Sequence, residues 1–431
     1  MTGLTILLLG SGGREHALAW KLSRSETVEK VYALPGNDGI AMLPKLGCLA
    51  GNPADPAFVI GTAQKLGVGL VVIGPEKPLE AGVADALAAA GIPAMGPMSA
   101  AARLESSKIF AKEFMSEFGI PTAPFKVADS YDAAVAAVTN WPVEEKGIVV
   151  KADGLAAGKG VVVTHDRAEA LQTLHDFMRD PACTVKTDRI LLEEKLSGKE
   201  VSAFALCDGR DFVTLGFVCD YKRVRDNDEG PNTGGMGGYA PRDWPSPAAR
   251  KFVEEKIFRA TLDGMAKRDT PFSGVLFAGL MIDGNTVNVI EFNTRFGDPE
   301  TQILMPLIED DIADLFLAAA TGKLAGRGVT LRPAEAVHIV MASEGYPETF
   351  DGAMKLGQPI VLPEAMLENS NDNFLFVMGA KKGDNGWTNQ GGRVLGVTAL
   401  GATIDEARDN AYRAIAKISF TGAHWRKDIG R

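Results

Sequence analysis

Two apolar runs flank a short polar turn between residues 277 and 300, and the pattern of hydrophobic positions is clearest in this segment. The turn reads Asp283-Gly284-Asn285, and Asp-Gly or Gly-Asn between alternating runs is the strongest short-range signal for a β-hairpin. The pattern therefore predicts two antiparallel strands joined by a tight turn.

Successive side chains of the hairpin's second strand point to opposite faces. The alternation predicts one face with Val287, Val289, Glu291 and Asn293, and an opposite face with Ile290 and Phe292. Glu291 and Asn293 then point the same way, and such oxygen ligands suit Mg²⁺ shared with nucleotide phosphates. Arg295, Asp298 and Glu300 follow directly. A solvated strand end with scattered charges is the alternative for the Glu-x-Asn pair taken alone.

Residues 5–23 read as a buried strand, a glycine-rich loop at 10–16 and a helix. Glycines between a strand and a helix let backbone N–H groups approach a phosphate. We expect Gly12, Gly13 and Arg14 to bind a phosphate-bearing small substrate, with a bare tight turn as the alternative.

The dinucleotide-binding fingerprint is incomplete, because Glu15 stands where a glycine is required and no acidic residue follows the strand at 30–34. NAD is therefore disfavoured. A further apolar strand at 70–73 repeats the pattern of a strand that ends in a turn. Since ligands of open α/β sheets bind beyond the carboxyl ends of the strands, Asn37 and Glu76 are expected to line the same crevice.

A second glycine-rich loop, at 153–160, lies between strands predicted at 147–151 and 161–163. It fails the Walker template, because its glycine-to-lysine spacing is one residue short, the Ser/Thr is missing and a strand follows instead of a helix. A glycine hairpin that folds over a triphosphate fits better, with Lys151 and Lys159 supplying positive charge. A hairpin with solvated lysines is the alternative.

The strand predicted at 190–196 runs into polar residues, and its backbone is a candidate for binding a nucleotide base, with Glu200 accepting ribose hydroxyl groups. Asp220 and Lys222 belong to the densest basic cluster, which a glycine-rich loop at 230–238 follows. Such a loop is a lid or a linker, and the charged residues before it favour a lid.

From about residue 326 the pattern changes to short strands around one clear helix at 403–418, which indicates a small α+β domain. The strands are predicted at 337–341, 374–378 and 394–397. Arg393, at the entrance of the last strand, is a cation that could meet a phosphate from the first domain. A turn before a strand is an equally good interpretation.

The composition is that of a globular protein of about three domains, since the chain has 431 residues and 46% of them are hydrophobic. A net charge of −10 without a basic block argues against nucleic acid or an anionic membrane as partner. Four scattered cysteines and no signal-peptide pattern predict a reduced, cytoplasmic protein. Five histidines without ligand spacing make zinc an unlikely metal.

Five motifs in order resemble the ATP-grasp superfamily and, within it, the glycinamide ribonucleotide synthetases (phosphoribosylamine-glycine ligases). The motifs are Gly10-Ser-Gly-Gly-Arg-Glu-His16, Gly74-Pro-Glu76, Lys151-Ala-Asp-Gly-Leu-Ala-Ala-Gly-Lys-Gly160, Gly230-Pro-Asn-Thr-Gly-Gly-Met-Gly237 and Glu291-Phe-Asn-Thr-Arg-Phe-Gly-Asp-Pro-Glu300. The resemblance implies α/β and α+β domains: a Rossmann-like N-terminal domain at 1–105, an ATP-grasp fold at 106–325 with a small subdomain at about 122–192, and a C-terminal α+β domain at 326–431.

The resemblance also implies roles for individual residues. ATP would be bound by Lys108, Lys151, Gly158, Lys159, Gly160, Glu193, Glu194, Leu196 and Glu200. Substrates would be bound by Gly12, Gly13, Arg14, Asn37, Glu76, Asp220, Lys222 and Arg393, with Arg295 and Asp298 as the catalytic residues. Glu291 and Asn293 would bind Mg²⁺, or Mn²⁺. The chain departs from the family at Cys219 and at 376–380, where C-terminal substrate contacts are expected.

The implied reaction joins glycine to 5-phosphoribosylamine through glycyl phosphate, with ATP as cosubstrate and no obligatory protein partner. Three other functions compete with it: another ATP-grasp ligase or carboxylase acting on a ribonucleotide, a Rossmann oxidoreductase, and a non-catalytic nucleotide sensor. The incomplete dinucleotide fingerprint argues against the oxidoreductase. Retention of both lysines and both metal ligands argues against the sensor.

Overall fold

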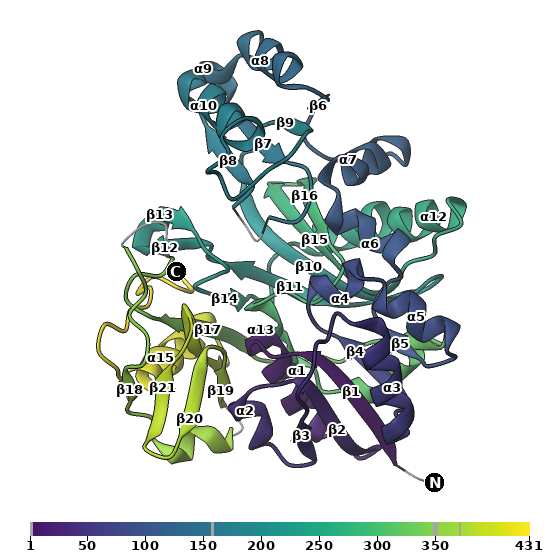
Figure 1. The fold of residues 1–431 in the computed structure, drawn as a ribbon, viewed down its shortest axis with the longest axis vertical. Coiled ribbons are helices and arrows are strands. Elements are labelled where there is room, and N and C mark those ends of the chain that lie inside the picture. The colour runs from purple at the N-terminus through teal and green to yellow at the C-terminus, as the bar shows by residue number, and fades with distance from the viewer. Residues whose placement is uncertain (1–2, 157–158, 348–351, 370–371) are drawn as a thin grey trace.

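The computed structural model describes residues 3–156, 159–347, 352–369 and 372–431. Its N-terminal part is a parallel sheet, as the apolar runs predict (Figure 1). Across this sheet the strands are β3 (Leu46–Cys48), β2 (Val28–Pro35), β1 (Leu4–Gly10), β4 (Leu70–Ile73) and β5 (Ala94–Met95). Its helices are α1 (Gly13–Ser23), α2 (Asp38–Ala41), α3 (Pro56–Leu66), α4 (Glu76–Glu80), α5 (Val83–Ala89) and α6 (Ser99–Ser106). Buried residues on both faces of β1 explain its unbroken hydrophobic run.

A small antiparallel sheet forms the separate lobe at the top of Figure 1. Its strands are β6 (Phe125–Ala128), β9 (Ile190–Glu194), β7 (Ile148–Ala152) and β8 (Val161–Thr164), in that order. The helices of the lobe are α8 (Tyr131–Thr139), α9 (Val143–Lys146) and α10 (Arg167–Met178). Val138, Leu174 and Ile190 belong to its own hydrophobic core, so the lobe packs as a unit.

An antiparallel sheet of eight strands forms the centre of the molecule. Its strands are β16 (Thr286–Asn293), β15 (Ser273–Asp283), β10 (Lys199–Asp208), β11 (Phe212–Asp220), β14 (Gly237–Ala240), β17 (Glu335–Ala342), β22 (Arg393–Gly401) and β19 (Asn373–Val377). Its helices are α7 (Lys108–Glu117), α11 (Pro247–Phe252), η2 (Val253–Phe258), α12 (Arg259–Lys267), α13 (Glu300–Leu307), α14 (Ile312–Ala320) and α15 (Ile404–Ile415). The C-terminal strands β17, β22 and β19 thus extend the central sheet through β14.

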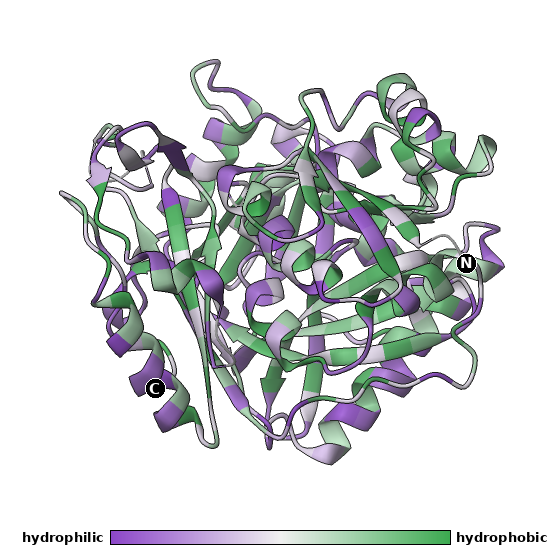
Figure 2. Ribbon diagram, turned by 90° about the horizontal axis from the view of Figure 1, so that it is seen from below, coloured by the Kyte–Doolittle hydropathy of each residue, from purple (hydrophilic) through white to green (hydrophobic). Residues whose placement is uncertain are grey.

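Two further sheets lie near the C-terminal strands in Figure 1, and two short 3-10 helices complete the described elements. One sheet pairs β12 (Arg223–Arg225) with β13 (Glu229–Asn232). The other contains β18 (Pro359–Ile360), β21 (Gly386–Asn389) and β20 (Ala380–Gly383), in that order. The 3-10 helices are η1 (Asp226–Asp228) and η3 (Glu364–Glu368). Figure 2 shows mainly hydrophobic strands in the interior and mixed helices outside. Among the described residues, no helix has the length and apolar character needed to cross a membrane.

The predicted hairpin is confirmed as β15 and β16, with Gly284 in the turn at a φ of 57°. The predicted faces of β16 are wrong in one respect. The register shifts so that Gly279 pairs with Glu291 and Leu280 with Val289, which leaves Ile290 as a bulge. Val287 and Val289 therefore lie in one hydrophobic core with Phe292, while Glu291 and Asn293 face away from it.

The N-terminal helices pack against the C-terminal strand β19. Nδ1 of His16 accepts a hydrogen bond of 2.8 Å from the N–H of Val377. Trp20 packs edge-on against Phe374, with ring centroids 4.9 Å apart. A Cβ on Gly13 would lie 2.7 Å from Cγ of Met378, so the loop after β1 and the segment after β19 are in close contact.

Candidate active site

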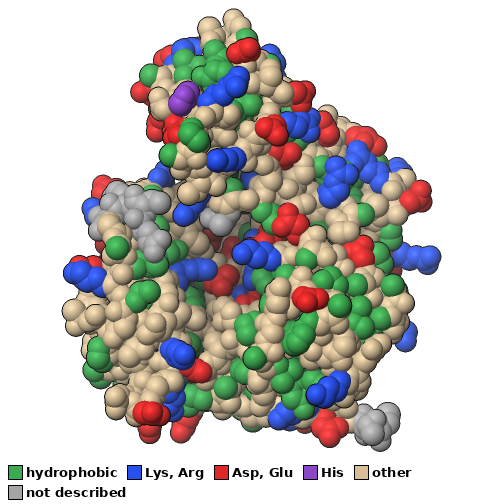
Figure 3. Space-filling view, viewed as in Figure 1, with side chains coloured by type: hydrophobic (Ala, Val, Ile, Leu, Met, Phe, Trp, Pro, Cys, Tyr) green, Lys and Arg blue, Asp and Glu red, His purple; other side chains and the backbone are tan. Residues whose placement is uncertain are grey.

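A cavity of about 230 Å³ lies beside the hairpin, between the small lobe and the rest of the molecule. Figure 3 shows this hollow with acidic and basic side chains inside it. Eleven of the residues predicted from the sequence line it: Glu76, Lys108, Lys151, Gly160, Glu193, Asp220, Lys222, Glu291, Asn293, Arg295 and Asp298. Residues from distant parts of the chain therefore converge on one site.

Glu291 and Asn293 form the acidic end of the cavity. Burial raises the pKa of the Glu291 carboxyl, but Lys222, Lys151 and Lys108 outweigh this effect and hold that pKa below its usual range. Among the described residues, no hydrogen bond or ion pair engages the Glu291 carboxylate. Oδ1 of Asn293 accepts one bond of 3.1 Å, from Nη2 of Arg295. An ionised carboxylate and an amide oxygen on neighbouring same-face positions fit a hard divalent cation.

Two lysines approach this acidic end from the small lobe and from α7. Nζ of Lys151 lies 2.7 Å from Oε1 of Glu193 and 3.3 Å from the main-chain oxygen of Ile290. Nζ of Lys108 donates to the main-chain oxygen of Gly154, at 2.7 Å, in the glycine-rich loop. Burial lowers the pKa of Lys108, with Glu291 acting in the opposite direction. Protein atoms therefore hold both ammonium groups beside the cavity, so no phosphate is needed to position them.

Lys222 also lines the cavity and forms an ion pair with Glu200. Burial acts to lower the pKa of Lys222, but Glu200, Asp220 and Glu291 raise it well above its usual value. Oδ1 of Asp220 is buried and has no hydrogen-bond partner among the described residues. Burial raises the pKa of Asp220 to about 7, although Lys222 opposes this effect. Asp220 therefore lines the cavity with an oxygen, Oδ1, that has no hydrogen-bond partner among the described residues.

Arg295 is held by carboxylates from two other elements. Its Nη2 lies 2.8 Å from Oε1 of Glu105, and its Nε lies 3.8 Å from Oε2 of Glu76. Nε is buried without a hydrogen-bond partner. The guanidinium is thus fixed in place and still has a donor to offer.

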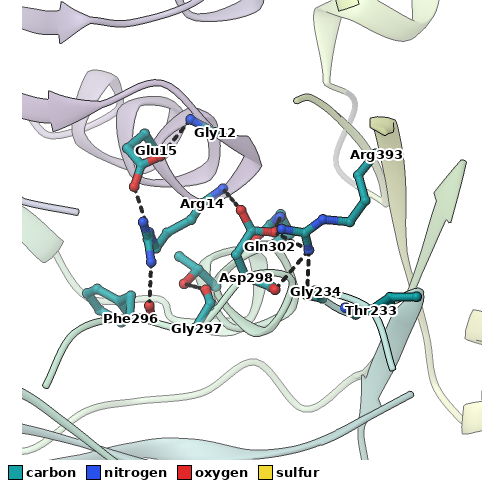
Figure 4. A network of polar contacts seen from close by, with 12 residues as sticks. Gly12, Arg14, Glu15, Thr233, Gly234, Phe296, Gly297, Asp298, Gln302 and Arg393 are labelled. Atoms are coloured by element: carbon teal, nitrogen blue, oxygen red, sulfur yellow. Dashed lines mark hydrogen bonds and ion pairs between the residues drawn. The ribbon is translucent and has the colours of Figure 1, made fainter. Parts of the chain in front are cut away.

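Asp298 connects three separate parts of the chain (Figure 4). Its Oδ1 lies 3.0 Å from Nη1 of Arg393 and accepts a bond of 2.9 Å from Nε2 of Gln302. Its Oδ2 accepts a bond of 3.2 Å from the main-chain N–H of Arg14. Burial raises the pKa of Asp298, but Arg393 and Arg14 outweigh it and keep the carboxylate ionised.

The loop after β1 does not line the cavity. The guanidinium of Arg14 is buried and donates to Oε1 of Glu15 at 2.6 Å and to the main-chain oxygen of Phe296 at 3.0 Å (Figure 4). The N–H of Gly12 donates to Oε2 of Glu15. The Asn37 amide bridges the main-chain oxygens of Ser11 and Val377. In this structure these residues connect protein segments, and of the N-terminal candidates only Glu76 reaches the cavity.

The predicted base-binding strand, β9, lies between β6 and β7, so both of its backbone edges are paired up to Glu194. Its carboxylate Glu193 is buried with Lys151, and the N–H of Glu194 donates to the main-chain oxygen of Pro124. Leu196 lies beyond the end of the strand. Lys159 is exposed and does not line the cavity, whereas Gly158 lies outside the described residues.

The stretch predicted as a lid is largely built into the fold. Its last residues form β14, where a Cβ on Gly237 would lie 2.3 Å from the main-chain oxygen of His338. The preceding β12–β13 hairpin docks on the C-terminal segment, with Nη1 of Arg426 2.7 Å from Oδ1 of Asp228. The close approach in β14 explains the glycines without requiring a mobile loop.

Sequence reasoning missed two charged residues of the cavity, Glu105 and Lys112, and named a third, Glu300, without giving it a role. Glu105 holds Arg295 and accepts the N–H of Thr294, a contact across 189 positions that no local pattern reveals. Glu300 is visible in the sequence as the last residue of the Arg295-to-Glu300 run. Its Oε1 accepts a bond from Ser202, and burial raises its pKa.

Three family models match the chain. They are the N domain of phosphoribosylglycinamide synthetase at residues 4–105, its ATP-grasp (A) domain at 106–301 and its C domain at 336–431. A phosphoribosylamine–glycine ligase of Streptomyces coelicolor is 45% identical over 431 residues, covering 99% of this chain and 98% of the relative. The corresponding ligase of Chlorobaculum tepidum is 40% identical over 430 residues and covers 99% of both chains.

Solved structures give the same picture. The phosphoribosylamine–glycine ligase of Thermotoga maritima matches with a TM-score of 0.85 and 33% identity, covering 99% of this chain and all of that one. A biotin carboxylase domain of Hydrogenobacter thermophilus, solved with magnesium ADP, matches with a TM-score of 0.74, covering 97% of this chain and 91% of that one. At 15% identity it shows the fold alone. The predicted combination of an N-terminal domain, an ATP-grasp fold and a C-terminal domain is confirmed.

Proposed function

The chain belongs to the phosphoribosylglycinamide synthetase family, and we propose that its cavity carries out the reaction for which its relatives are named. The protein is an ATP-dependent ligase that joins glycine to 5-phosphoribosylamine in purine biosynthesis, with ADP, phosphate and glycinamide ribonucleotide as products. The observation that carries this function is the convergence of Lys108, Lys151 and Lys222 on the Glu291–Asn293 end of one cavity.

The reaction takes two steps. A glycine carboxylate oxygen attacks the γ-phosphorus of ATP, the bond to the β-phosphate oxygen breaks, and ADP leaves glycyl phosphate behind. The amine of phosphoribosylamine then attacks the acyl carbon, phosphate leaves and the amine gives up a proton. Neither step needs a nucleophile from the protein, but both need neutralised charge and the exclusion of water.

The cations of the cavity supply that neutralisation. We assign Lys108, Lys151 and Lys159 to the ATP phosphates, because charge-assisted hydrogen bonds to phosphate are strong. Glu194, Leu196 and Glu200 are assigned to the base and ribose. Gly158 and Gly160 are assigned to the loop over the phosphates. Support comes from the cavity lining for Lys108, Lys151 and Gly160, and from the family resemblance for the rest.

Glu291 and Asn293 are the residues that would hold a metal ion. Mg²⁺ bound there supplies positive charge at the transferring phosphoryl group. The ionised, uncommitted carboxylate of Glu291 and the amide oxygen of Asn293 fit such an ion. Mn²⁺ accepts similar oxygen ligands and is proposed as an alternative metal.

The remaining substrates are assigned to other residues of the site. Arg295 and Asp298 would face glycine, and Asp220 and Lys222 are cavity residues suited to a polar substrate. Gly12, Gly13, Arg14, Asn37, Glu76 and Arg393 are assigned to phosphoribosylamine. For Arg14 and Asn37 that assignment rests on the family resemblance, since their side chains bond to protein here. The domain limits 1–105, 106–325 and 326–431 and a cytoplasmic location are parts of the same proposal.

The decisive test is ADP release with ATP, Mg²⁺, phosphoribosylamine and one amino acid at a time. We expect ADP with glycine and far less with alanine or serine, because a site built around a bare methylene has no room for a side chain. Omission of phosphoribosylamine is the control for uncoupled hydrolysis. Equal turnover with alanine, serine and glycine would contradict the assignment to this ligase.

A further inference from the structure

Three charged side chains in the cavity wall form a buried row. Nζ of Lys112 lies 2.9 Å from Oε2 of Glu193, and Nζ of Lys151 lies 2.7 Å from Oε1 of the same carboxylate. Lys112 is 1% exposed, and Glu193 and Lys151 are each 3% exposed. One carboxylate is thus shared by two ammonium groups away from solvent.

The row crosses from the small lobe to the body of the protein. Glu193 and Lys151 lie on the adjacent strands β9 and β7, whereas Lys112 lies on α7. Nζ of Lys112 also donates to Oγ1 of Thr122, at 2.5 Å, and that hydroxyl donates to the main-chain oxygen of Val289 at 2.6 Å. The Lys112 ammonium group, although in the cavity wall, is therefore already engaged by two protein acceptors, one of them Glu193.

The charges in this row determine what a nucleotide phosphate would encounter. Glu193 by itself cancels the charge of Lys151, so a phosphate would approach a neutral pair. Lys112 adds a second cation, and the three groups together carry one net positive charge. Burial lowers the pKa of Lys112 to about 8, with Glu193 acting against it, so its ammonium form predominates at pH 7.

We propose that Lys112 is a positioning residue that compensates the charge of Glu193, so that Lys151 stays fixed by that carboxylate and still presents a net positive charge to ATP. The inference rests on the proposed function insofar as it takes Lys151 to meet a phosphate. It assigns to Lys112 a role that the sequence did not indicate. It also gives Glu193 a role in orienting Lys151.

The test removes these charges one at a time and together, and calorimetry measures how tightly each variant binds ADP with Mg²⁺. Lys112→Met deletes the compensating cation and should weaken binding about tenfold, the equivalent of one charge-assisted contact. Glu193→Gln leaves two cations and keeps an amide oxygen for Lys151, so any loss of affinity should stay below the tenfold expected for Lys112→Met. The double variant restores one net positive charge and should return to within about threefold of the parent affinity, less than half a decade.

Lys126→Met is the matched control, because Lys126 is exposed on β6 of the same lobe. It should bind ADP like the parent. A Lys112→Met protein with parent affinity and an unchanged melting temperature would overturn the proposal. So would a double variant weaker than Lys112→Met, because packing losses add whereas charge compensation reverses. Should Lys112→Met not fold, Glu193→Gln alone decides, and a tenfold loss of affinity in that variant overturns the inference.

Binding and ligation separate this inference from the proposed function. If ADP binding changes among these variants as expected but the protein shows no glycine-dependent turnover, the role of Lys112 stands and the ligase assignment is wrong. Glycine-dependent turnover with normal ADP binding by Lys112→Met would do the reverse.

Discussion

Nη1 of Arg393 lies 3.0 Å from Oδ1 of Asp298, and this ion pair joins the first residue of β22 to the segment that follows β16 (Figure 4). The same Nη1 also donates to the main-chain oxygens of Asp298, at 2.9 Å, and of Gly234, at 2.7 Å. One guanidinium therefore fixes two segments at the edge of the cavity.

Arg393→Lys should disturb this edge selectively. Lysine keeps the charge but lacks the planar fork of arginine, so it cannot reproduce the contacts to both segments. We expect kcat/KM for phosphoribosylamine to fall about tenfold, the equivalent of one charged hydrogen bond. ATP binding should not change, because the proposed phosphate lysines lie on other elements.

Steady-state kinetics with each substrate varied in turn would measure this effect. Arg413→Lys, on the exposed side of α15, is a suitable control. An equal change in the KM values of all three substrates would instead indicate general loosening of the fold.

Glu291→Gln should affect turnover and metal dependence rather than folding. The substitution keeps the shape of the side chain and deletes its charge, while Val289 and Phe292 still hold the strand in the core. Turnover should fall roughly 10²-fold or more, as for loss of one preorganised electrostatic contact. The Mg²⁺ concentration for half-maximal ADP binding should rise, which calorimetry measures independently of activity.

Asn293→Ala should act in the same direction but more mildly, because an amide contributes a dipole and no charge. Its effect and that of Glu291→Gln should be less than additive, since both side chains would serve one ion. A Glu291→Gln protein with parental turnover and metal dependence would show that this face is only a solvated strand end.

The parts of the fold that sequence predicted well are those controlled by local chemistry. The Asp283-Gly284-Asn285 turn has a glycine at positive φ, and its strands follow directly from that geometry. The bulge at Ile290 was not predicted, because its residue type carries no turn signal. Its cause is tertiary, since the valines before it pack in the core while Glu291 faces the cavity.

Other features were not predicted because they depend on partners far away in sequence. Arg14 remains a predicted phosphate ligand, but the bond of its guanidinium to the main-chain oxygen of Phe296 joins residues 282 positions apart, and no local pattern reveals it. The central strands β10 and β11 were also missed. Both are buried in long unbroken runs, so neither shows the alternation by which a half-exposed strand is recognised.

His16 gives the protein an acid-sensitive contact between the N-terminal helices and β19. Burial lowers the pKa of His16 to about 4, and its Nδ1 accepts the N–H of Val377, which requires an unprotonated nitrogen. In the unfolded chain the pKa is about 6.5. The unfolded state therefore binds more protons between pH 6.5 and 4, so stability is full above pH 6.5 and falls as the pH is lowered through this range.

His16→Gln can offer an oxygen to Val377 without titrating, and it should flatten this pH dependence. Between pH 7.5 and 5 the parent should lose about 2 kcal/mol more in free energy of unfolding than the variant. Urea unfolding at the two pH values measures the difference, and His338, whose pKa burial lowers to about 3, contributes equally to both proteins. Parallel pH profiles for parent and variant would exclude His16 as a source of acid sensitivity and leave its contact with Val377 a matter of packing.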